Sequence, residues 1–170
     1  MPDTAEYLSR IRECAEGKDP MAAQAQSPEH IAELIANIPA EKLRARPAPD
    51  KWSVAEILAH LAEDEIATAW RYRQMVEHNG GELAGFDQDL WAKLGNYSGR
   101  DPRDSLGLFR LLREANLHFL GALAAEQWEC FGIHAERGRI TVRDLAAHMV
   151  GHDANHIEQI RKIVLETCRG

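Results

Sequence analysis

Residues 147–160 read AHMVGHDANHIEQI and contain three histidines at steps of four. Residues four apart lie one turn apart on nearly the same face of a helix, so two imidazoles at this spacing can reach one metal ion. The flanking sequence favours a helix, because residues 141–169 contain no proline and one glycine, and apolar residues recur at helical spacing. A helical wheel places His156 inside the apolar stripe, His152 at its edge and His148 nearer the rim. We therefore expect His152 and His156 to face the interior of a helical domain.

Start signals predict the other helices. Ser53-Val54-Ala55-Glu56 is a capping box that opens a long helix to about Glu77, with His60 on the flank of its apolar stripe. Asp101-Pro102 starts a helix to about Ala125, and Ser27-Pro28-Glu29 starts one to about Asn37. Thr4–Glu16 forms a short amphipathic helix before them. The residues of the 101–125 helix expected to point inward are Leu108, Leu111, Leu112, Ala115, Phe119, Leu120 and Leu123.

This order of elements predicts an all-α fold, an up-down-type four-helix bundle with an N-terminal helical extension. The extension covers residues 1–26 and the bundle domain covers residues 27–168. Long connections follow the second and third bundle helices, and the first of them contains Phe86–Trp91, which we expect to cover the site. Strand signals are weak, since no segment alternates apolar and polar residues for long.

Composition excludes several classes of function. The 170 residues carry a net charge of −7 with no basic block, which argues against binding to nucleic acid. No apolar run is long enough to span a membrane, and no secretion signal is visible at the start. Cys14, Cys130 and Cys168 lie far apart without a CxxC motif, so we expect reduced thiols in a cytoplasmic protein.

Bundles build metal sites from side chains on facing helices. His60, His152 and His156 would supply three neutral nitrogen donors and leave a position open, which is the arrangement of a catalytic zinc site. Nickel, iron, manganese or copper also fit such ligands, so the ion is not fixed by ligand type. Asp64, one turn beyond His60, is a candidate for orienting a ligand through its other ring nitrogen. The remaining histidines, His30, His78, His118 and His134, are expected to have no role in metal binding.

Two motifs carry a resemblance to a family. Residues 52–61 resemble the W-S-x-x-E-x-L-x-H-L signature of the DinB-like superfamily, and residues 152–160 resemble its H-x-x-x-H-x-x-Q-I signature. The resemblance spans roughly residues 27–164, and His148 is an addition beside the motif. It implies a four-helix bundle that holds a divalent metal on His60, His152 and His156, and frequent homodimers. It also implies a relation to bacillithiol- or mycothiol-dependent S-transferases and isomerases, in which the metal activates a low-molecular-weight thiol.

Three functions stay open at this point. The first is a metal-dependent enzyme, S-transferase or hydrolase-like, that activates a thiol or water and acts on a small-molecule substrate. The second is a non-catalytic bundle that a metal stabilises and that acts as a dimer or a binding module. The third is a metal-free bundle with polar histidines in its core.

Overall fold

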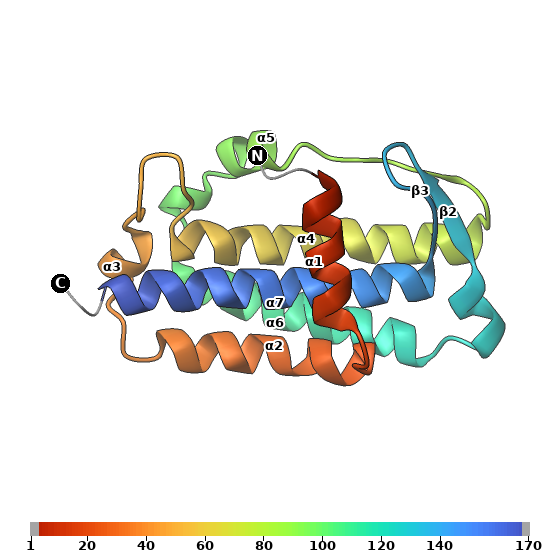
Figure 1. Cartoon of the computed structure of the whole chain (residues 1–170), viewed down its shortest axis with the longest axis horizontal. Coiled ribbons are helices and arrows are strands. Elements are labelled where there is room, and N and C mark those ends of the chain that lie inside the picture. Colours follow the sequence, from red (N-terminus) through yellow and green to blue (C-terminus); the bar gives the residue numbers. More distant parts are fainter. Residues whose placement is uncertain (1–3, 168–170) are drawn as a thin grey trace.

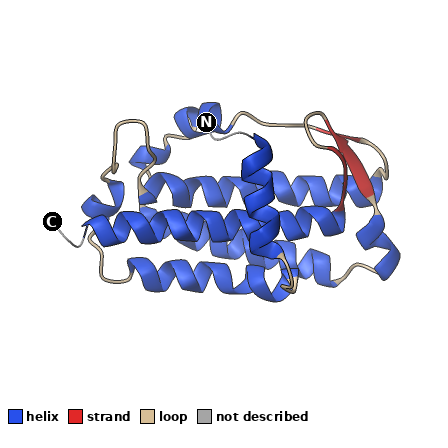
Figure 2. Cartoon of the chain, in the orientation of Figure 1, coloured by secondary structure: helices blue, strands red, loops and turns tan. Residues whose placement is uncertain are grey.

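The computed structural model describes residues 4–167, which are mostly helical (Figure 2). Four long helices lie side by side: α2 (Pro20–Ile35), α4 (Val54–Glu77), α6 (Pro102–Gly121) and α7 (Val142–Thr167) (Figure 1). The predicted four-helix bundle is therefore confirmed. The short N-terminal helix α1 (Thr4–Ala15) lies across α7, on the outside of the bundle.

The shorter elements occupy the connections. They are α3 (Ala40–Arg44), β1 (Glu82–Leu83), α5 (Gln88–Leu94), η1 (Tyr97–Gly99), η2 (Ala125–Glu129), β2 (Phe131–His134) and β3 (Gly138–Thr141). Strand β2 lies between the other two, parallel to β1 and antiparallel to β3. Strands this short show no sustained alternation of apolar and polar residues, so they were not predicted from the sequence. Gly138, with φ of +68°, faces His134 across the tight turn of the hairpin.

The helices of the bundle do not simply alternate in direction. Helices α4 and α6 run the same way along the bundle, whereas α2 and α7 run the opposite way (Figure 1). The connection 78–101 must therefore return along the length of the bundle before α6 begins. The sequence predicted this long connection, and crossover connections of this kind are what permit two successive parallel helices.

Helix α2 begins earlier than expected. A start at Ser27 was wrong, because the helix begins at Pro20, where Asp19 accepts a hydrogen bond from the Ala22 amide at 2.7 Å. Pro28 lies inside the helix and cannot donate to the carbonyl of Gln24. Arg113 donates to that oxygen instead, at 3.0 Å, so the proline leaves no unsatisfied carbonyl there. The boundary at residues 26 and 27 falls within α2, and the division of the chain into an extension and a bundle domain stays a prediction.

The core consists of two apolar clusters with a polar layer between them. Along α4 the first cluster ends at Ala62 and the second begins at Tyr72. Between them lie the buried polar residues Asp64, Glu65 and Thr68, and the corresponding turns of α6 and α7 are polar too. Buried polar groups must be paired or must bind something. The centre of the bundle is therefore where the site should be sought.

The inward face of α6 differs from the expected one. Leu108 and Leu111 are exposed at 40% and 66%, and Ala115 is exposed too, so the placement of these three residues in the core was wrong. The buried face consists of Pro102, Ser105, Leu106, Phe109, Arg113, Asn116 and Leu120. An arginine and an asparagine on this face interrupt its apolar stripe, and the opposite face therefore looks more hydrophobic in the sequence.

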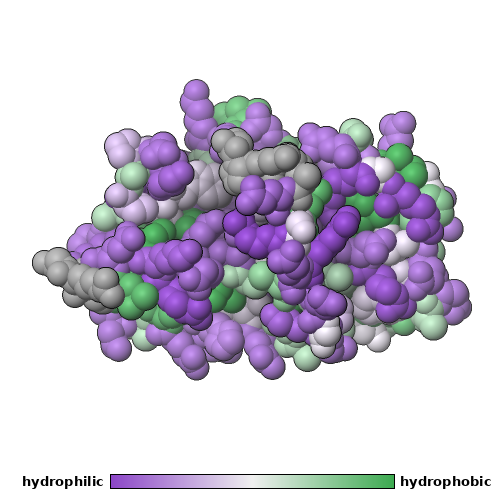
Figure 3. Space-filling model, viewed as in Figure 1, coloured by the Kyte–Doolittle hydropathy of each residue, from purple (hydrophilic) through white to green (hydrophobic). Residues whose placement is uncertain are grey.

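The surface on the α1 side is mainly hydrophilic, with hydrophobic side chains gathered in small separate areas (Figure 3). Among the helices of residues 4–167, none is both long and apolar enough to cross a membrane.

Candidate metal centre

The structure brings together the three histidines that the sequence singled out. His60 comes from α4, and His152 and His156 come from α7. One nitrogen of each ring lies within 4.8 Å of the others, and all three side chains are buried. The Nε2 atoms of His60 and His152 are 3.1 Å apart. The ring of His156 lies 5.0 Å from that of His60 and 4.5 Å from that of His152.

This donor set fits a divalent ion. Tetrahedral zinc binds imidazole nitrogen at about 2.0–2.1 Å, which places two ligand nitrogens roughly 3.3 Å apart. The observed separation of 3.1 Å between the two Nε2 atoms is close to this value. Two buried ring nitrogens at this distance must share one proton or face a common cation. The geometry of the site is therefore compatible with a shared ion.

Burial also keeps these rings neutral. Burial, together with the neighbouring His152 and against the opposing charge of Asp64, lowers the pKa of His60 to about 4. Burial likewise holds the pKa of His156 well below its ordinary value of 6.5. A neutral imidazole offers a lone pair, and an imidazolium does not. Both rings are thus in the metal-binding form at neutral pH.

Hydrogen bonds and ring contacts orient two of the ligands. Nδ1 of His156 lies 3.1 Å from Oε1 of Gln159. A proton on Nδ1 is donated to this oxygen, and the lone pair of Nε2 is then free to bind a metal ion. The ring of His60 packs against Trp52 with a centroid distance of 5.1 Å. Trp52 in turn meets the edge of Tyr97 in η1. The connection 78–101 therefore reaches the site through Tyr97, and the predicted covering role of Phe86–Trp91 stays a prediction.

Asp64 lies beside the third ring. Its carboxylate is buried, and Oδ2 is 3.7 Å from Nδ1 of His152, which has no hydrogen-bond partner among the described residues. Burial raises the pKa of Asp64, but the nearby histidines His152 and His60, together with Arg71, outweigh this effect and lower it. A carboxylate this close can receive the Nδ1 proton after a small movement. This position agrees with the role expected of Asp64, the orientation of a histidine through its second ring nitrogen.

The other candidate side chains lie apart from the three rings. The ring of His148 is 6.3 Å from that of His152, and burial together with Arg137 lowers the pKa of His148 to about 3. His134 is buried in β2 and accepts from the Glu136 amide at 3.2 Å. The remaining histidines, His30, His78 and His118, are exposed. Cys14 and Cys130 are free thiols, and Cys168 lies outside the described residues.

A buried ion network adjoins the site, and the sequence did not reveal it. Arg113, exposed at only 1%, bonds Asp153 at 2.6 and 3.0 Å and Glu65 at 2.7 Å. Asn116 also donates to Glu65, at 2.8 Å. With the Gln24 carbonyl, Arg113 of α6 thus connects α2, α4 and α7. Because Asp153 follows His152 directly, the network fixes the turn of α7 that carries the histidines.

Helix α1 lies against α7 at this same turn. A Cβ atom on Gly151 would come within 2.1 Å of the Ile11 carbonyl oxygen, so only glycine permits this close approach. Burial raises the pKa of Tyr7 to about 12, and the charge of Asp64 raises it as well, which places this phenol within electrostatic range of the site. Helix α1 therefore covers the turn of α7 that carries His148 and His152.

The fold and the site define a class of protein: a helical bundle with three buried histidines on two facing helices. A model of the DinB superfamily matches residues 24–160, and the chain belongs to this family. A comparison with curated proteins found no match.

Two solved structures share the fold. YfiT from Bacillus subtilis, described as a probable metal-dependent hydrolase with an unusual four-helix bundle topology, aligns with a TM-score of 0.79 and 19% identity. The alignment covers 85% of this chain and 83% of that chain. The mycothiol-dependent maleylpyruvate isomerase aligns with a TM-score of 0.62 and 10% identity, over 87% of this chain and 65% of that one. This chain therefore spans just under two thirds of the isomerase.

Proposed function

We propose that this protein is a metal-dependent enzyme acting on a small molecule, with His60, His152 and His156 as ligands of a divalent ion, zinc in the first place. The observation that carries the proposal is three buried imidazoles from two helices with donor atoms within 4.8 Å of one another. The description of YfiT as a metal-dependent hydrolase supports it. Nickel, iron and manganese are the alternative ions.

The ion would supply Lewis-acid chemistry, which lowers the pKa of a water or thiol beside it. The residues of the chain would prepare the site. Gln159 would hold the ring of His156, Asp64 would accept from Nδ1 of His152 after a small movement, and Trp52 would cover one side of the ring of His60. A low-molecular-weight thiol as second cofactor is part of the proposal, supported by the thiol-dependent isomerase among the structures with this fold.

Metal analysis tests the proposal directly. Elemental analysis of protein purified from metal-replete medium should find about one divalent ion per chain in the wild type and little in His152→Ala. His118→Ala, which removes an exposed histidine from α6, is the matched control and should keep the ion. Equal and negligible metal in the wild type and in His152→Ala would reject the proposal.

A non-catalytic bundle is the second candidate. The contact between His60 and His152 joins α4 to α7, so an ion there would link two bundle helices. Bound metal would then raise stability by mass action. A chelator that lowers the melting temperature, without turnover in panels of thiols and electrophiles, would favour this alternative. Metal-dependent turnover would favour the enzyme.

We also propose a cytoplasmic homodimer. Exposed apolar side chains on the adjacent helices α4 and α6 support the dimer: Ile66, Trp70, Leu108 and Leu111. Light scattering on the wild type and on Trp70→Lys should show a dimer converted to a monomer, and a monomeric wild type would rule the dimer out. Free Cys14 and Cys130 agree with a reducing compartment.

A further inference from the structure

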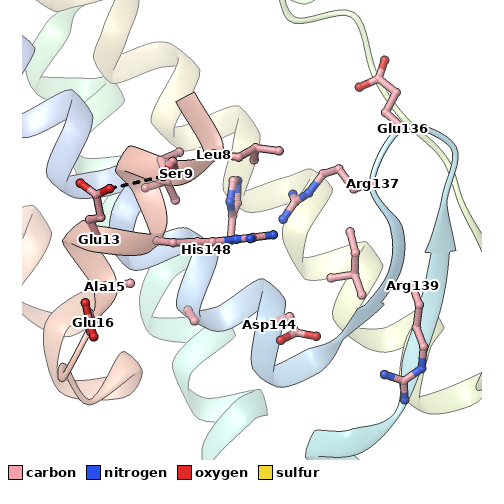
Figure 4. A pocket seen from close by; sticks show the side chains of 14 residues that line it. Leu8, Ser9, Glu13, Ala15, Glu16, Glu136, Arg137, Arg139, Asp144 and His148 are labelled. Atoms are coloured by element: carbon pink, nitrogen blue, oxygen red, sulfur yellow. Dashed lines mark hydrogen bonds between the residues drawn. The ribbon is translucent and has the colours of Figure 1, made fainter. Parts of the chain in front are cut away.

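A cleft of about 800 Å³ lies between α1, the β2–β3 turn and the first half of α7 (Figure 4). Its size is that of a small-molecule site. His148 lines the cleft, and its ring lies 6.3 Å from the ring of His152. The cleft therefore approaches the proposed metal centre from the side of α7 that α1 covers.

Positive side chains from α1 and from the β2–β3 hairpin line this cleft. Arg12 of α1 and Arg137 of the β2–β3 turn both line it, and Arg137 reaches toward His148 (Figure 4). Burial lowers the pKa of Arg137, and the positive charges of Arg71 on α4 and of Arg12 lower it further, against the opposing effects of Tyr7 and Asp144. Arg137 therefore lies within electrostatic range of two other guanidinium groups. Like charges held together in a partly buried place repel one another unless an anion joins them.

Arg71 of α4 does not line the cleft, but its positive charge acts on Arg137. Its guanidinium donates to the Ala84 carbonyl at 2.9 Å and lies over the ring of Phe86 at 5.5 Å. Burial lowers the pKa of Arg71, while the charge of Asp64 raises it. Asp64 therefore offsets part of the charge of Arg71.

None of the carboxylates that line the cleft is hydrogen-bonded to Arg137: two accept from other residues, and two point or lie away from it. Glu13 accepts from Ser9 at 3.3 Å, and Asp144 accepts from Thr141 at 2.7 Å. Glu136 points away from His148, and Glu16 lies at the far end of α1 from Arg137 (Figure 4). Among the described residues, Arg137 makes no hydrogen bond or ion pair. Asp144 raises the pKa of Arg137 and has its own pKa lowered by Arg12, so it offsets part of their charge from within the cleft. Neither guanidinium has a hydrogen-bonded carboxylate partner among the described residues, so both can still donate to a bound oxyanion.

We propose that the cleft binds the oxyanion end of the substrate, a carboxylate or a phosphate, on Arg137 and Arg12. The planar guanidinium fork matches both of these groups. The rest of the bound molecule would extend past His148 toward His152. That the bound anion is a substrate rests on the proposed function. The binding of the anion itself does not, because the two arginines can hold it without a metal.

Two simple probes, succinate and ethyl phosphate, test the proposal on ¹⁵N-labelled full-length protein. Titration should give saturable shifts of the amide signals of the β2–β3 turn and α1, and the tighter of the two probes identifies the oxyanion. Succinamide, which has the same carbon skeleton without charge, should give none. Arg137→Gln should weaken binding about tenfold or more, the usual effect of losing a charge-assisted hydrogen bond. Arg12→Gln is a second variant, on an exposed position of α1, and should weaken it as well.

Arg110→Gln is the matched control. Arg110 of α6 forms an ion pair with Glu29 of α2 at the surface, and neither residue lines the cleft. The variant loses the same charge and should bind the probes as the wild type does. Wild-type affinity in both Arg137→Gln and Arg12→Gln, or equal binding of succinamide, would overturn the proposal, as would the absence of any shift.

His152→Ala separates this proposal from the metal site. We expect that variant to lose the ion and still bind the probe, and Arg137→Gln to lose the probe and keep the ion. Failure of the metal experiment alone would leave an anion-binding cleft in a metal-free protein. Failure of the anion experiment alone would leave the proposed metal site intact.

Discussion

Arg113 donates two hydrogen bonds to Asp153, at 2.6 and 3.0 Å, where neither side chain is more than 2% exposed. In Arg113→Met the carboxylates of Glu65 and Asp153 would stay buried without their cation. Breaking a buried ion pair by removing one partner costs about 3–5 kcal/mol. We expect a loss of this size in the free energy of unfolding, measured by urea denaturation. Arg110 lies on the same helix as Arg113 and forms an exposed ion pair with Glu29 of α2. Arg110→Met should therefore lower the free energy of unfolding by less than about 1 kcal/mol.

Two helical glycines should respond in opposite ways to alanine. A Cβ atom on Gly151 would meet the Ile11 carbonyl oxygen at 2.1 Å, so α1 must move away from α7. At Gly107 in α6 a Cβ atom would have nothing within 4 Å. We expect Gly151→Ala to lower the free energy of unfolding by about 1–3 kcal/mol and Gly107→Ala to raise it by up to about 1 kcal/mol. A stabilised Gly151→Ala protein, measured in the same thermal or urea melt, would contradict the close contact.

The capping box of α4 predicts a pH-dependent stability. Burial raises the pKa of Glu56, but hydrogen bonds from Arg46 and Ser53 outweigh it and bring the pKa below its ordinary value of 4.5. The ionised form is thus favoured by folding, and its contribution is present above pH 4.5 and lost as the pH falls through the lower folded pKa. Glu56→Gln should cost about 1 kcal/mol at pH 7, and the difference from the wild type should shrink toward pH 3.

Urea midpoints at the two pH values check this expectation. Glu114→Gln, on the exposed face of α6, removes the same charge and should show no such pH-dependent difference. A cost for Glu56→Gln that is equal at pH 7 and pH 3 would mean that the carboxylate charge does not stabilise the helix start.

Gln159 should set the metal affinity without binding the ion. Its Oε1 atom lies 3.1 Å from Nδ1 of His156, and losing such a partner of a ligand lowers metal affinity about 10- to 100-fold. We expect Gln159→Ala to show this loss in a chelator competition assay, with an unchanged helical circular dichroism spectrum. Gln159→Glu keeps an acceptor at this position and should recover most of the affinity. The neighbouring surface variant Glu158→Gln is the control, and an affinity loss there equal to that of Gln159→Ala would point to a general charge effect.

Local signals in the sequence were enough for much of this architecture. The caps at Ser53 and Asp101 and the histidine spacing in α7 depend on residues within one or two turns, and the structure has all three features. The burial of His60 beside His152 also agrees with the wheel and with the motif pair. These features are predictable because a helix places nearby residues in a fixed geometry.

The features that sequence reasoning missed depend on distant partners. Ser27-Pro28 was taken as a helix start because Arg113, which donates to the Gln24 carbonyl in place of the missing proline N–H, lies far away in the sequence. Because Arg113 lies on the buried face of α6, the exposed face with Leu108 and Leu111 is the more apolar of the two, and it was mistaken for the inward face. The direction of α6 relative to α4 and the placement of Arg137 beside Arg12 are likewise set by packing between elements. Short strands such as β2 give too few residues for a period to be recognised.

The parallel course of α4 and α6 has a consequence for how this scaffold can diversify. Helix α4 has 24 residues and is therefore about 36 Å long, a distance that roughly eleven extended residues would cover. The segment 78–101 is longer than this minimum and holds α5 and η1 in its spare length. Insertions, deletions and exchanges in that spare length can change how the segment packs on Trp52 beside His60 while the four long helices keep their register. A laboratory library aimed at new substrates should therefore begin in this segment.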